Sequence, residues 1–285
     1  MGAELTGTIL KYPGSKNKIA DKIIALFPDN YRNMTYLEPF FGSGAVFFQK
    51  APSIIETIND LNEEVYNFFK QVREHGELLA KLVEYTPWSR QELENALIQS
   101  ESDIENARRF LVRCWFTIGS DGVTRYRSSG WSHNIKDNNG NIYSFAKLPA
   151  VIKDVSYRLM PKKDNCVQIE NKDAFGLIEK YKNYENVLMY LDPPYVKSTL
   201  KVKKKYQVEM SDADHVRLCN LINTSKAKII LSGYENRIYD EHLQGFMKTG
   251  IQAYDIKGNK RLEVLWTNYS VANELFDFEH EEATG

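Results

Sequence analysis

Tyr190-Leu191-Asp192-Pro193-Pro194-Tyr195 is the most informative segment of the sequence. It completes the apolar run Val187–Leu191, which predicts a buried strand. Because two prolines can continue neither a strand nor a helix, they predict a stiff turn after it. Asp192 and Tyr195 are therefore expected at the carboxyl end of a strand, the edge of an open α/β sheet where ligands bind.

The turn brings together two hydrogen-bond acceptors and an aromatic ring. The Asp192 carboxylate and the Pro193 carbonyl can accept hydrogen bonds, and Tyr195 offers a flat face. This set suits a planar group that carries an exocyclic NH2. A proline-rich turn after a core strand is the plainer interpretation, and the four residues alone do not separate the two.

Length and composition narrow the choice of protein class. The chain has 285 residues, of which 42% are hydrophobic, enough for one large domain or a domain with a smaller one inserted. It has no apolar run of about 18 residues and no charged-then-apolar start, so we expect neither a membrane span nor a secretory signal. Three widely spaced cysteines fit a reducing cytoplasm and provide no metal or disulfide framework. The net charge of −1 gives no global sign of nucleic-acid binding.

A glycine turn follows another predicted strand. Tyr36–Phe48 has the pattern of a strand, the turn Gly42-Ser43-Gly44 and a helix. Phe47 stands where the dinucleotide fingerprint needs its third glycine, and no Gly-Lys-Ser/Thr is present, so a phosphate-binding P-loop is not predicted. The next predicted strand ends in Asp60, near the spacing at which a nucleotide fold places a carboxylate against ribose hydroxyls. Capping of the following helix is a second role for Asp60, and both roles can hold at once.

The middle of the chain interrupts the strand–helix alternation. Residues from about 77 to 118 have a helical pattern, and the alternation resumes at 167–175, so we expect an insertion between two halves of one sheet. Residues 119–145 are rich in Gly, Ser, Asn and Asp, and are too long for a silent connection. Further strands are predicted at Lys228–Ser232 and Leu262–Tyr269.

Asp-Pro-Pro-Tyr after an apolar strand resembles the catalytic motif of Dam-like (alpha-group) DNA adenine-N6 methyltransferases, which use S-adenosylmethionine. Five further segments resemble motifs of that family, in the family's own order. They are Leu10–Lys16, Glu38–Gly44, Asp60, 167–175 and Glu263–Asn268. Asp192, rather than Asn or Ser, favours adenine over cytosine N4 or protein glutamine by the same resemblance.

The resemblance implies an α/β fold: a Rossmann-like methyltransferase sheet with helices on both faces, and an inserted, mostly helical target-recognition domain with a hairpin loop. The catalytic domain would comprise residues 1–75 and 160–273, and the insertion residues 76–159. The acidic tail, 274–285, is expected to be disordered.

The resemblance also assigns roles to residues. The catalytic set is Asp192, Pro193, Pro194 and Tyr195, which would bind an adenine turned out of the duplex. The set expected to bind S-adenosylmethionine comprises Tyr12, Lys16, Glu38, Phe40, Phe41, Gly42, Ser43, Gly44, Asp60, Asp173, Phe175 and Asp192. Asp173 would accept a hydrogen bond from the cofactor's adenine, with helix capping as the alternative.

Basic and aromatic residues in two loops are expected to contact DNA. Arginine can fork onto guanine or phosphate, and aromatic rings can wedge or stack. The set comprises Arg125, Tyr126, Arg127, Trp131, Lys197 and Lys201. An ordinary surface hairpin is the alternative for the first four, and their position within the methyltransferase-like order argues against it.

The predicted function is therefore site-specific transfer of a methyl group from S-adenosylmethionine to adenine N6 in double-stranded DNA, in the cytoplasm, with no metal and no membrane. An RNA adenine-N6 methyltransferase and a DNA-binding module without turnover are alternatives. The incomplete glycine fingerprint speaks against a nicotinamide oxidoreductase. The sequence leaves open the target site and whether a restriction endonuclease belongs to the same system.

Overall fold

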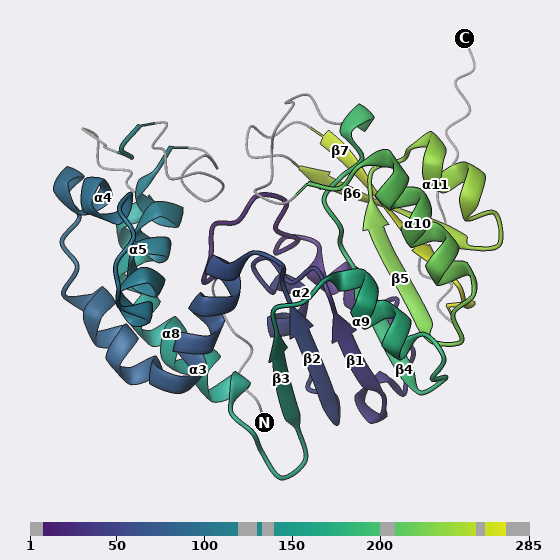
Figure 1. Ribbon diagram of the computed structural model, residues 1–285, viewed down its shortest axis with the longest axis horizontal. Helices are drawn as coiled ribbons and strands as arrows, with labels where there is room; N and C mark the ends of the chain where they lie inside the picture. Colours follow the sequence, from purple (N-terminus) through teal and green to yellow (C-terminus); the bar gives the residue numbers. More distant parts are fainter. Residues whose placement is uncertain (1–7, 119–129, 133–139, 200–208, 255–259, 272–285) are drawn as a thin grey trace.

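A computed structural model describes residues 8–118, 130–132, 140–199, 209–254 and 260–271. Its centre is a seven-stranded sheet in the order β3-β2-β1-β4-β5-β7-β6 (Figure 1). The strands are β1 (Thr35–Glu38), β2 (Ile55–Asn59), β3 (Cys166–Glu170), β4 (Val187–Leu191), β5 (Lys228–Gly233), β6 (Met247–Tyr254) and β7 (Lys260–Thr267). β7 pairs antiparallel with both β5 and β6, and the other strand pairs are parallel.

The direction in which strands are added reverses between β1 and β4. From β1 the chain proceeds outward through β2 and β3, and from β4 it proceeds to the other side through β5. The pairing of Leu37 with Met189 brings Glu38 level with Tyr190, next to the carboxyl ends of both strands. Open α/β sheets bind ligands beyond the carboxyl ends of their strands at such a switch point.

Helices cover both faces of the sheet. Alternate residues of a strand point to opposite faces, and they divide accordingly between two buried clusters. Tyr36 and Tyr190 belong to one cluster, Leu37 and Leu191 to the other. The first cluster contains residues of α1 (Ala20–Ile24), α2 (Ala45–Gln49) and α3 (Glu63–Glu84), and the second contains residues of α9 (Ala174–Tyr181), α10 (Asp212–Asn223) and α11 (Arg237–His242). The predicted Rossmann-like sheet with helices on both faces is confirmed.

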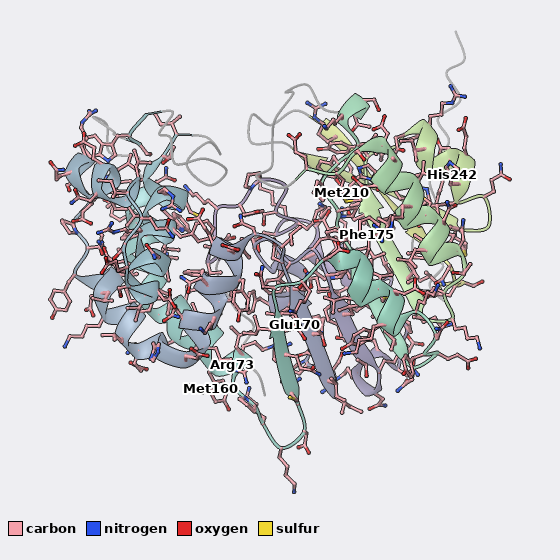
Figure 2. All side chains as sticks on the ribbon, in the orientation of Figure 1. Arg73, Met160, Glu170, Phe175, Met210 and His242 are labelled. Carbon is pink, nitrogen blue, oxygen red and sulfur yellow. The ribbon has the colours of Figure 1, made fainter. Side chains whose placement is uncertain are left out.

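A helical part separates β2 from β3 in the chain and lies at the left of Figure 1. It consists of α3, α4 (Arg90–Ala96), α5 (Asp103–Phe116), α7 (Gly140–Ala146) and α8 (Leu148–Leu159). α3 crosses the predicted domain boundary after residue 75, and its helical geometry is interrupted at His75 (φ −137°, ψ 32°). Arg73, labelled in Figure 2, ties α3 to β3 by donating to the carbonyl of Val167 at 2.9 Å. The division into domains stays a prediction.

A buried ionic cluster also joins the helical part to the sheet. Glu56 on β2 is fully buried and pairs with Lys50 and with Arg158 of α8, whose Nη2 lies 2.8 Å from Glu56 Oε1. Asn165 donates to Glu56 Oε2 at 2.9 Å. Burial alone would raise the pKa of the Glu56 carboxyl, but Lys50 and Arg158 outweigh it and lower that pKa. Glu56 is therefore a charged link between the two parts of the chain.

The far edge of the sheet departs from the sequence prediction. β6 was not predicted, because Lys248, Thr249 and Gly250 break any apolar run or clean alternation in this edge strand. The strand predicted at Leu262–Tyr269 exists as β7, but its antiparallel direction gave no signal in the sequence.

Some predictions fall on residues that the structure does not describe. Arg125, Tyr126, Arg127, Lys201 and the tail 274–285 all lie outside the described ranges. Within those ranges, no helix is both long and apolar enough to cross a membrane. The same ranges contain no group of three or more His, Cys, Asp or Glu residues arranged to hold a metal ion.

Candidate active site

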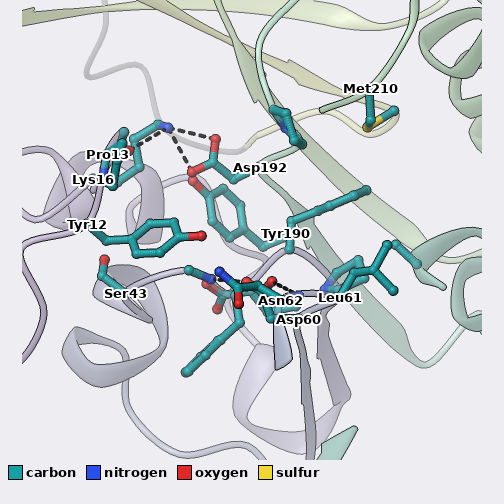
Figure 3. Close-up of a pocket in the computed structure, with 18 of the residues that line it drawn as sticks. Tyr12, Pro13, Lys16, Ser43, Asp60, Leu61, Asn62, Tyr190, Asp192 and Met210 are labelled. Atoms are coloured by element: carbon teal, nitrogen blue, oxygen red, sulfur yellow. Dashed lines mark hydrogen bonds and ion pairs between the residues drawn. The ribbon is translucent and has the colours of Figure 1, made fainter. Parts of the chain in front are cut away.

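A pocket of about 370 Å³ lies at the switch point between β1 and β4 (Figure 3). Its volume falls within the roughly 300–1,000 Å³ that is typical of ligand sites. The residues that line it are Tyr12, Pro13, Gly14, Ser15, Lys16, Glu38, Pro39, Phe40, Phe41, Gly42, Ser43, Ala45, Val46, Asp60, Leu61, Asn62, Asp173, Ala174, Phe175, Tyr190, Asp192, Pro194, Glu209, Met210, Asp214 and Arg217. Segments from both halves of the sheet thus meet around one cavity.

The loop between β1 and α2 borders the pocket with two glycines in the left-handed conformation, Gly42 (φ 52°) and Gly44 (φ 66°). A Cβ atom at Gly42 would lie 3.2 Å from the Tyr12 ring, and one at Gly44 would lie 2.4 Å from the Phe41 ring. Conformation and space therefore both require glycine at these positions. The same loop is tied to the N-terminal turn by a 2.9 Å hydrogen bond between the Ser43 and Ser15 hydroxyls.

Asp60 lies just beyond the carboxyl end of β2. Its carboxylate accepts hydrogen bonds from the backbone N–H groups of Gly42 at 2.7 Å and Asn62 at 2.9 Å. Burial raises the pKa of Asp60 to about 6, although both hydrogen bonds favour the charged form. The carboxylate is thus ionised at neutral pH, and a carboxylate has enough lone pairs to accept further bonds from a ligand's hydroxyls.

Two buried side chains lie at the switch point itself. Burial raises the pKa of Glu38 to about 8, although the Tyr36 hydroxyl donates to its Oε2 at 2.7 Å. The Tyr190 hydroxyl is buried and has no hydrogen-bond partner among the residues that the structure describes. Figure 3 shows the Tyr190 ring extending toward Asp192 and Lys16. A buried polar group without a hydrogen-bond partner is energetically costly, so the Tyr190 hydroxyl indicates that the pocket binds a polar ligand.

Lys16 reaches the turn after β4 from the N-terminal segment. Its Nζ lies 2.6 and 2.7 Å from the two carboxylate oxygens of Asp192 (Figure 3) and 2.9 Å from the Tyr195 hydroxyl. That hydroxyl donates to Glu263 at 3.1 Å. The Tyr195 ring stacks on Tyr234, with ring centroids 4.3 Å apart and planes 23° from parallel. Long-range contacts thus fix both the carboxylate and the ring of the turn.

The start of α9 forms another side of the pocket. Asp173 caps this helix, because its Oδ1 accepts from the Phe175 N–H at 3.4 Å, and it lines the pocket as well. The guanidinium of Arg217 lies 4.3 Å from the centroid of the Phe175 ring. Met210, which precedes α10, belongs to the same buried cluster as Phe175 (Figure 2).

The pocket brings together most of the predicted site residues. All residues predicted to bind the cofactor line the pocket except Gly44, which immediately precedes α2. Asp192 and Pro194 of the catalytic set line the pocket, whereas Pro193 and Tyr195 do not. The roles assigned to these residues stay predictions.

Sequence reasoning did not identify several of the residues that line the pocket. Asn62 could have been found, since it follows Asp60 by two positions and caps α3. The sequence pattern indicates for Tyr190 only a place in a core strand. Met210, Asp214 and Arg217 gave no signal beyond an ordinary capping pattern, because only the packing of α10 brings them to the pocket.

Two of the predicted DNA-contacting residues are described, and neither lines the pocket. Trp131 forms an isolated β-bridge with Thr117, and the Arg90 guanidinium lies 5.1 Å from the centroid of its ring. Lys197 lies in a 3-10 turn, η2 (Lys197–Thr199), with its side chain 56% exposed and its Nζ 3.5 Å from Glu209.

The groups around the pocket fit S-adenosylmethionine. They combine an ionised carboxylate at a strand end, a glycine loop that permits close approach, aromatic rings, and the buried hydroxyl of Tyr190. The cofactor carries the matching groups: ribose hydroxyls, a planar adenine and a polar amino-acid end.

Comparison with known proteins identifies the family. The family model of the D12 class N6 adenine-specific DNA methyltransferases matches residues 12–256. The chain is 27% identical over 285 residues to the type II methyltransferase M1.LlaDCHI of Lactococcus lactis subsp. cremoris. This match covers 91% of this chain and 94% of the relative. It is 24% identical over 296 residues to the type II methyltransferase M.MjaIII of Methanocaldococcus jannaschii, in a match that covers 91% of this chain and 98% of that relative. A solved S-adenosylmethionine-dependent methyltransferase from Agrobacterium tumefaciens is similar over 88% of this chain and 59% of its own, with a TM-score of 0.34 and 11% identity.

The family match spans the segment from the N-terminal turn through the Asp-Pro-Pro-Tyr turn and beyond it. The prediction of an adenine-N6 DNA methyltransferase that uses S-adenosylmethionine is confirmed, and the nicotinamide oxidoreductase alternative is wrong. The chain belongs to the D12 class of N6 adenine-specific DNA methyltransferases.

Proposed function

We propose that this pocket holds S-adenosylmethionine next to an extruded target adenine, and that Asp192 acts on the adenine. In this proposal, Asp60 accepts the ribose hydroxyls, while Asp173 and Phe175 contact the cofactor's adenine. Glu38 and the Tyr190 hydroxyl face its amino-acid end. The observation that carries the proposal is that Asp60 and Asp192, predicted from separate motifs to serve two ligands, line one continuous pocket.

S-adenosylmethionine supplies a methyl group that is already activated on a sulfonium. The residues of the chain align the acceptor nitrogen with it. Adenine N6 is a poor nucleophile because its lone pair is delocalised into the ring. Asp192 and the Pro193 carbonyl accept its N6–H groups, which raises the electron density on nitrogen and stabilises the positive charge that develops there. Tyr195 stacks on the base.

Lys16 has to share Asp192 with the substrate. Its ammonium donates hydrogen bonds to both carboxylate oxygens. The adenine amino group takes over one of these oxygens as the base enters. Because an ammonium has three donors, Lys16 can keep the other oxygen and the Tyr195 hydroxyl.

The substrate in this proposal is a specific site in double-stranded DNA. A base leaves the stack at a cost of about a few kcal/mol before it can reach such a turn. The inserted helical part, with Trp131, recognises the target, and Lys197 contacts phosphate, as do the arginines of residues 125–127 and Lys201 outside the described ranges. Since the two relatives are called type II methyltransferases, we also propose that a restriction endonuclease shares the target site. The DNA substrate supports a cytoplasmic location.

Asp192→Ala tests this function in a tritiated-methyl assay. We expect transfer to DNA to fall below detection while the circular dichroism spectrum still shows the intact fold. Asp60→Ala is expected to lose cofactor binding instead. Near wild-type transfer by Asp192→Ala would contradict the proposal. Parallel reactions on RNA test the alternative that the enzyme methylates adenine in RNA. Sequencing of modified adenines in DNA from expressing cells reveals the target site.

A further inference from the structure

Glu263 is a buried carboxylate behind the proposed catalytic turn. It lies on β7, and because β7 runs antiparallel to β5, this residue falls just beyond the Gly233–Val264 pair, at the carboxyl ends of the parallel strands. The residue is 2% exposed. Its Oε2 accepts from the Tyr195 hydroxyl at 3.1 Å, and its Oε1 accepts from the Ser232 hydroxyl at 2.8 Å.

Two carboxylates share the ammonium of Lys16. Lys16 Nζ lies 2.6 Å from Asp192 and 3.5 Å from Glu263. Because Lys16 is 5% exposed, bulk water screens these charges little. An isolated Lys16–Asp192 pair would neutralise Asp192 and hold both of its acceptor oxygens. A second carboxylate near the same ammonium draws part of that attraction away from Asp192.

Tyr195 connects Lys16 to Glu263 through its hydroxyl. Its hydroxyl accepts from Lys16 at 2.9 Å and donates to Glu263, while its ring stacks on Tyr234. The orientation of the ring at the end of a stiff Pro-Pro turn therefore depends on an acceptor that comes from a different strand. Ser232 in turn orients that acceptor.

We propose that Glu263 is a positioning residue for methyl transfer: it anchors the Tyr195 hydroxyl and competes with Asp192 for Lys16, so that Asp192 can release one oxygen to the target amine. This inference rests on the proposed function of Asp192. Glu263 itself touches neither substrate nor cofactor in the proposal, and it acts through Tyr195 and Lys16.

Glu263→Gln removes the charge and keeps the shape. We expect kcat for methyl transfer to fall about 10- to 100-fold, the loss that a misaligned reacting group causes. The dissociation constant for S-adenosylmethionine should change less than about threefold, because Glu263 does not line the pocket. Glu235→Gln is the matched control: its carboxylate is 64% exposed, lies just after Tyr234, and should leave both quantities unchanged.

A double-mutant cycle with Tyr195→Phe separates positioning from general damage. If Glu263 acts through the Tyr195 hydroxyl, the double variant loses about as much activity as the more damaged single variant. Losses that multiply independently, or a Glu263→Gln variant with wild-type kcat, would overturn the inference.

Further variants distinguish a failure of the positioning role from misfolding of Glu263→Gln and from a failure of the proposed function. If Glu263→Gln does not fold, Ser232→Ala replaces it, since the Ser232 hydroxyl donates to the same carboxylate. We expect this variant to lose several-fold in kcat with unchanged cofactor affinity. A wild-type kcat would overturn the inference. If Asp192→Ala is inactive while Glu263→Gln matches the wild type, only the positioning role fails. If Asp192→Ala is active, the proposed function itself fails.

Discussion

The ammonium of Lys16 lies 2.6 and 2.7 Å from the two carboxylate oxygens of Asp192, although the residues are 176 positions apart in the chain. These oxygens are the acceptors that the proposed mechanism gives to the target amine. Lys16 therefore occupies these acceptors with a cation that resembles, in charge and donors, the ammonium forming on N6 during transfer. Binding of the base replaces one of these bonds with one from a neutral amino group, which gains the positive charge only as the methyl group is transferred.

Lys16→Met should abolish most of the activity. Without the ammonium, Asp192 and the Tyr195 hydroxyl lose a shared donor and the turn loses its fixed geometry. We expect single-turnover methyl transfer to slow by about 100-fold or more, the typical loss when one preorganised charged group is removed. Lys18→Met, two residues away and exposed, is the control and should transfer at the wild-type rate. Equal rates for the two variants would remove Lys16 from the mechanism.

Gly44→Ala should destabilise the folded protein. The left-handed conformation alone costs roughly 1–2 kcal/mol for a residue with a Cβ, and this Cβ would also meet the Phe41 and Phe48 rings at 2.4 and 2.6 Å. Gly176→Ala in α9 is the opposite case, because, its chain neighbours and own helix backbone aside, no atom of the described residues lies within 4 Å of its Cβ position. There a helical alanine should stabilise by about 0.5–1 kcal/mol. Denaturant unfolding of the two variants measures their changes in unfolding free energy. Changes of the same sign in the two variants would contradict the structure.

The residues that sequence could identify all owe their position to local chain pattern. Asp60 and Asp192 end apolar runs, and parallel strands bring such ends to one edge, so their meeting in one pocket follows from the fold class. The contacts of Tyr195 with Glu263 and Tyr234 could not be predicted. The Glu263 contact depends on β7 entering the sheet antiparallel beside β5, and neither β7's direction nor the edge strand β6 left a periodic signal.

Cofactor affinity should depend on pH through Asp60. Its pKa of about 6 means that the carboxylate is ionised above pH 6 and protonated below it. Ribose hydroxyls donate to the ionised form, so affinity is full above pH 6 and falls as the pH drops through that value. Calorimetry should show the dissociation constant for S-adenosylmethionine rising about tenfold between pH 7 and pH 5.

Asp60→Asn is the control for that titration. Its weaker binding should show no inflection near pH 6, because the asparagine does not titrate. Glu38 also lines the pocket, but its pKa of about 8 puts its titration above this window. A wild-type affinity that is flat from pH 5 to pH 7, or an inflection that survives in Asp60→Asn, would rule out the carboxylate as a ribose acceptor.

Glu56→Gln should destabilise the protein through the link between β2 and α8. The substitution leaves Lys50 and Arg158 buried without the carboxylate that neutralises them, and breaking a buried ion pair costs about 3–5 kcal/mol. Glu77→Gln is the matched control. Glu77 on α3 also pairs with a residue of α8, Lys153, at 2.7 Å, but its side chain is 80% exposed, so the loss should be far smaller.

The pH dependence of this loss distinguishes charge from packing. The pKa of Glu56 is lowered in the folded state from its ordinary value of 4.5. Its charge therefore stabilises the fold fully above pH 4.5, and this contribution is lost as the pH falls through the lower folded-state pKa. The difference in unfolding free energy between wild type and Glu56→Gln should be constant from pH 7 to about pH 5 and then shrink toward acid. A difference that persists undiminished in acid would mean that shape and hydrogen bonds, and not the carboxylate's charge, hold α8 to the sheet.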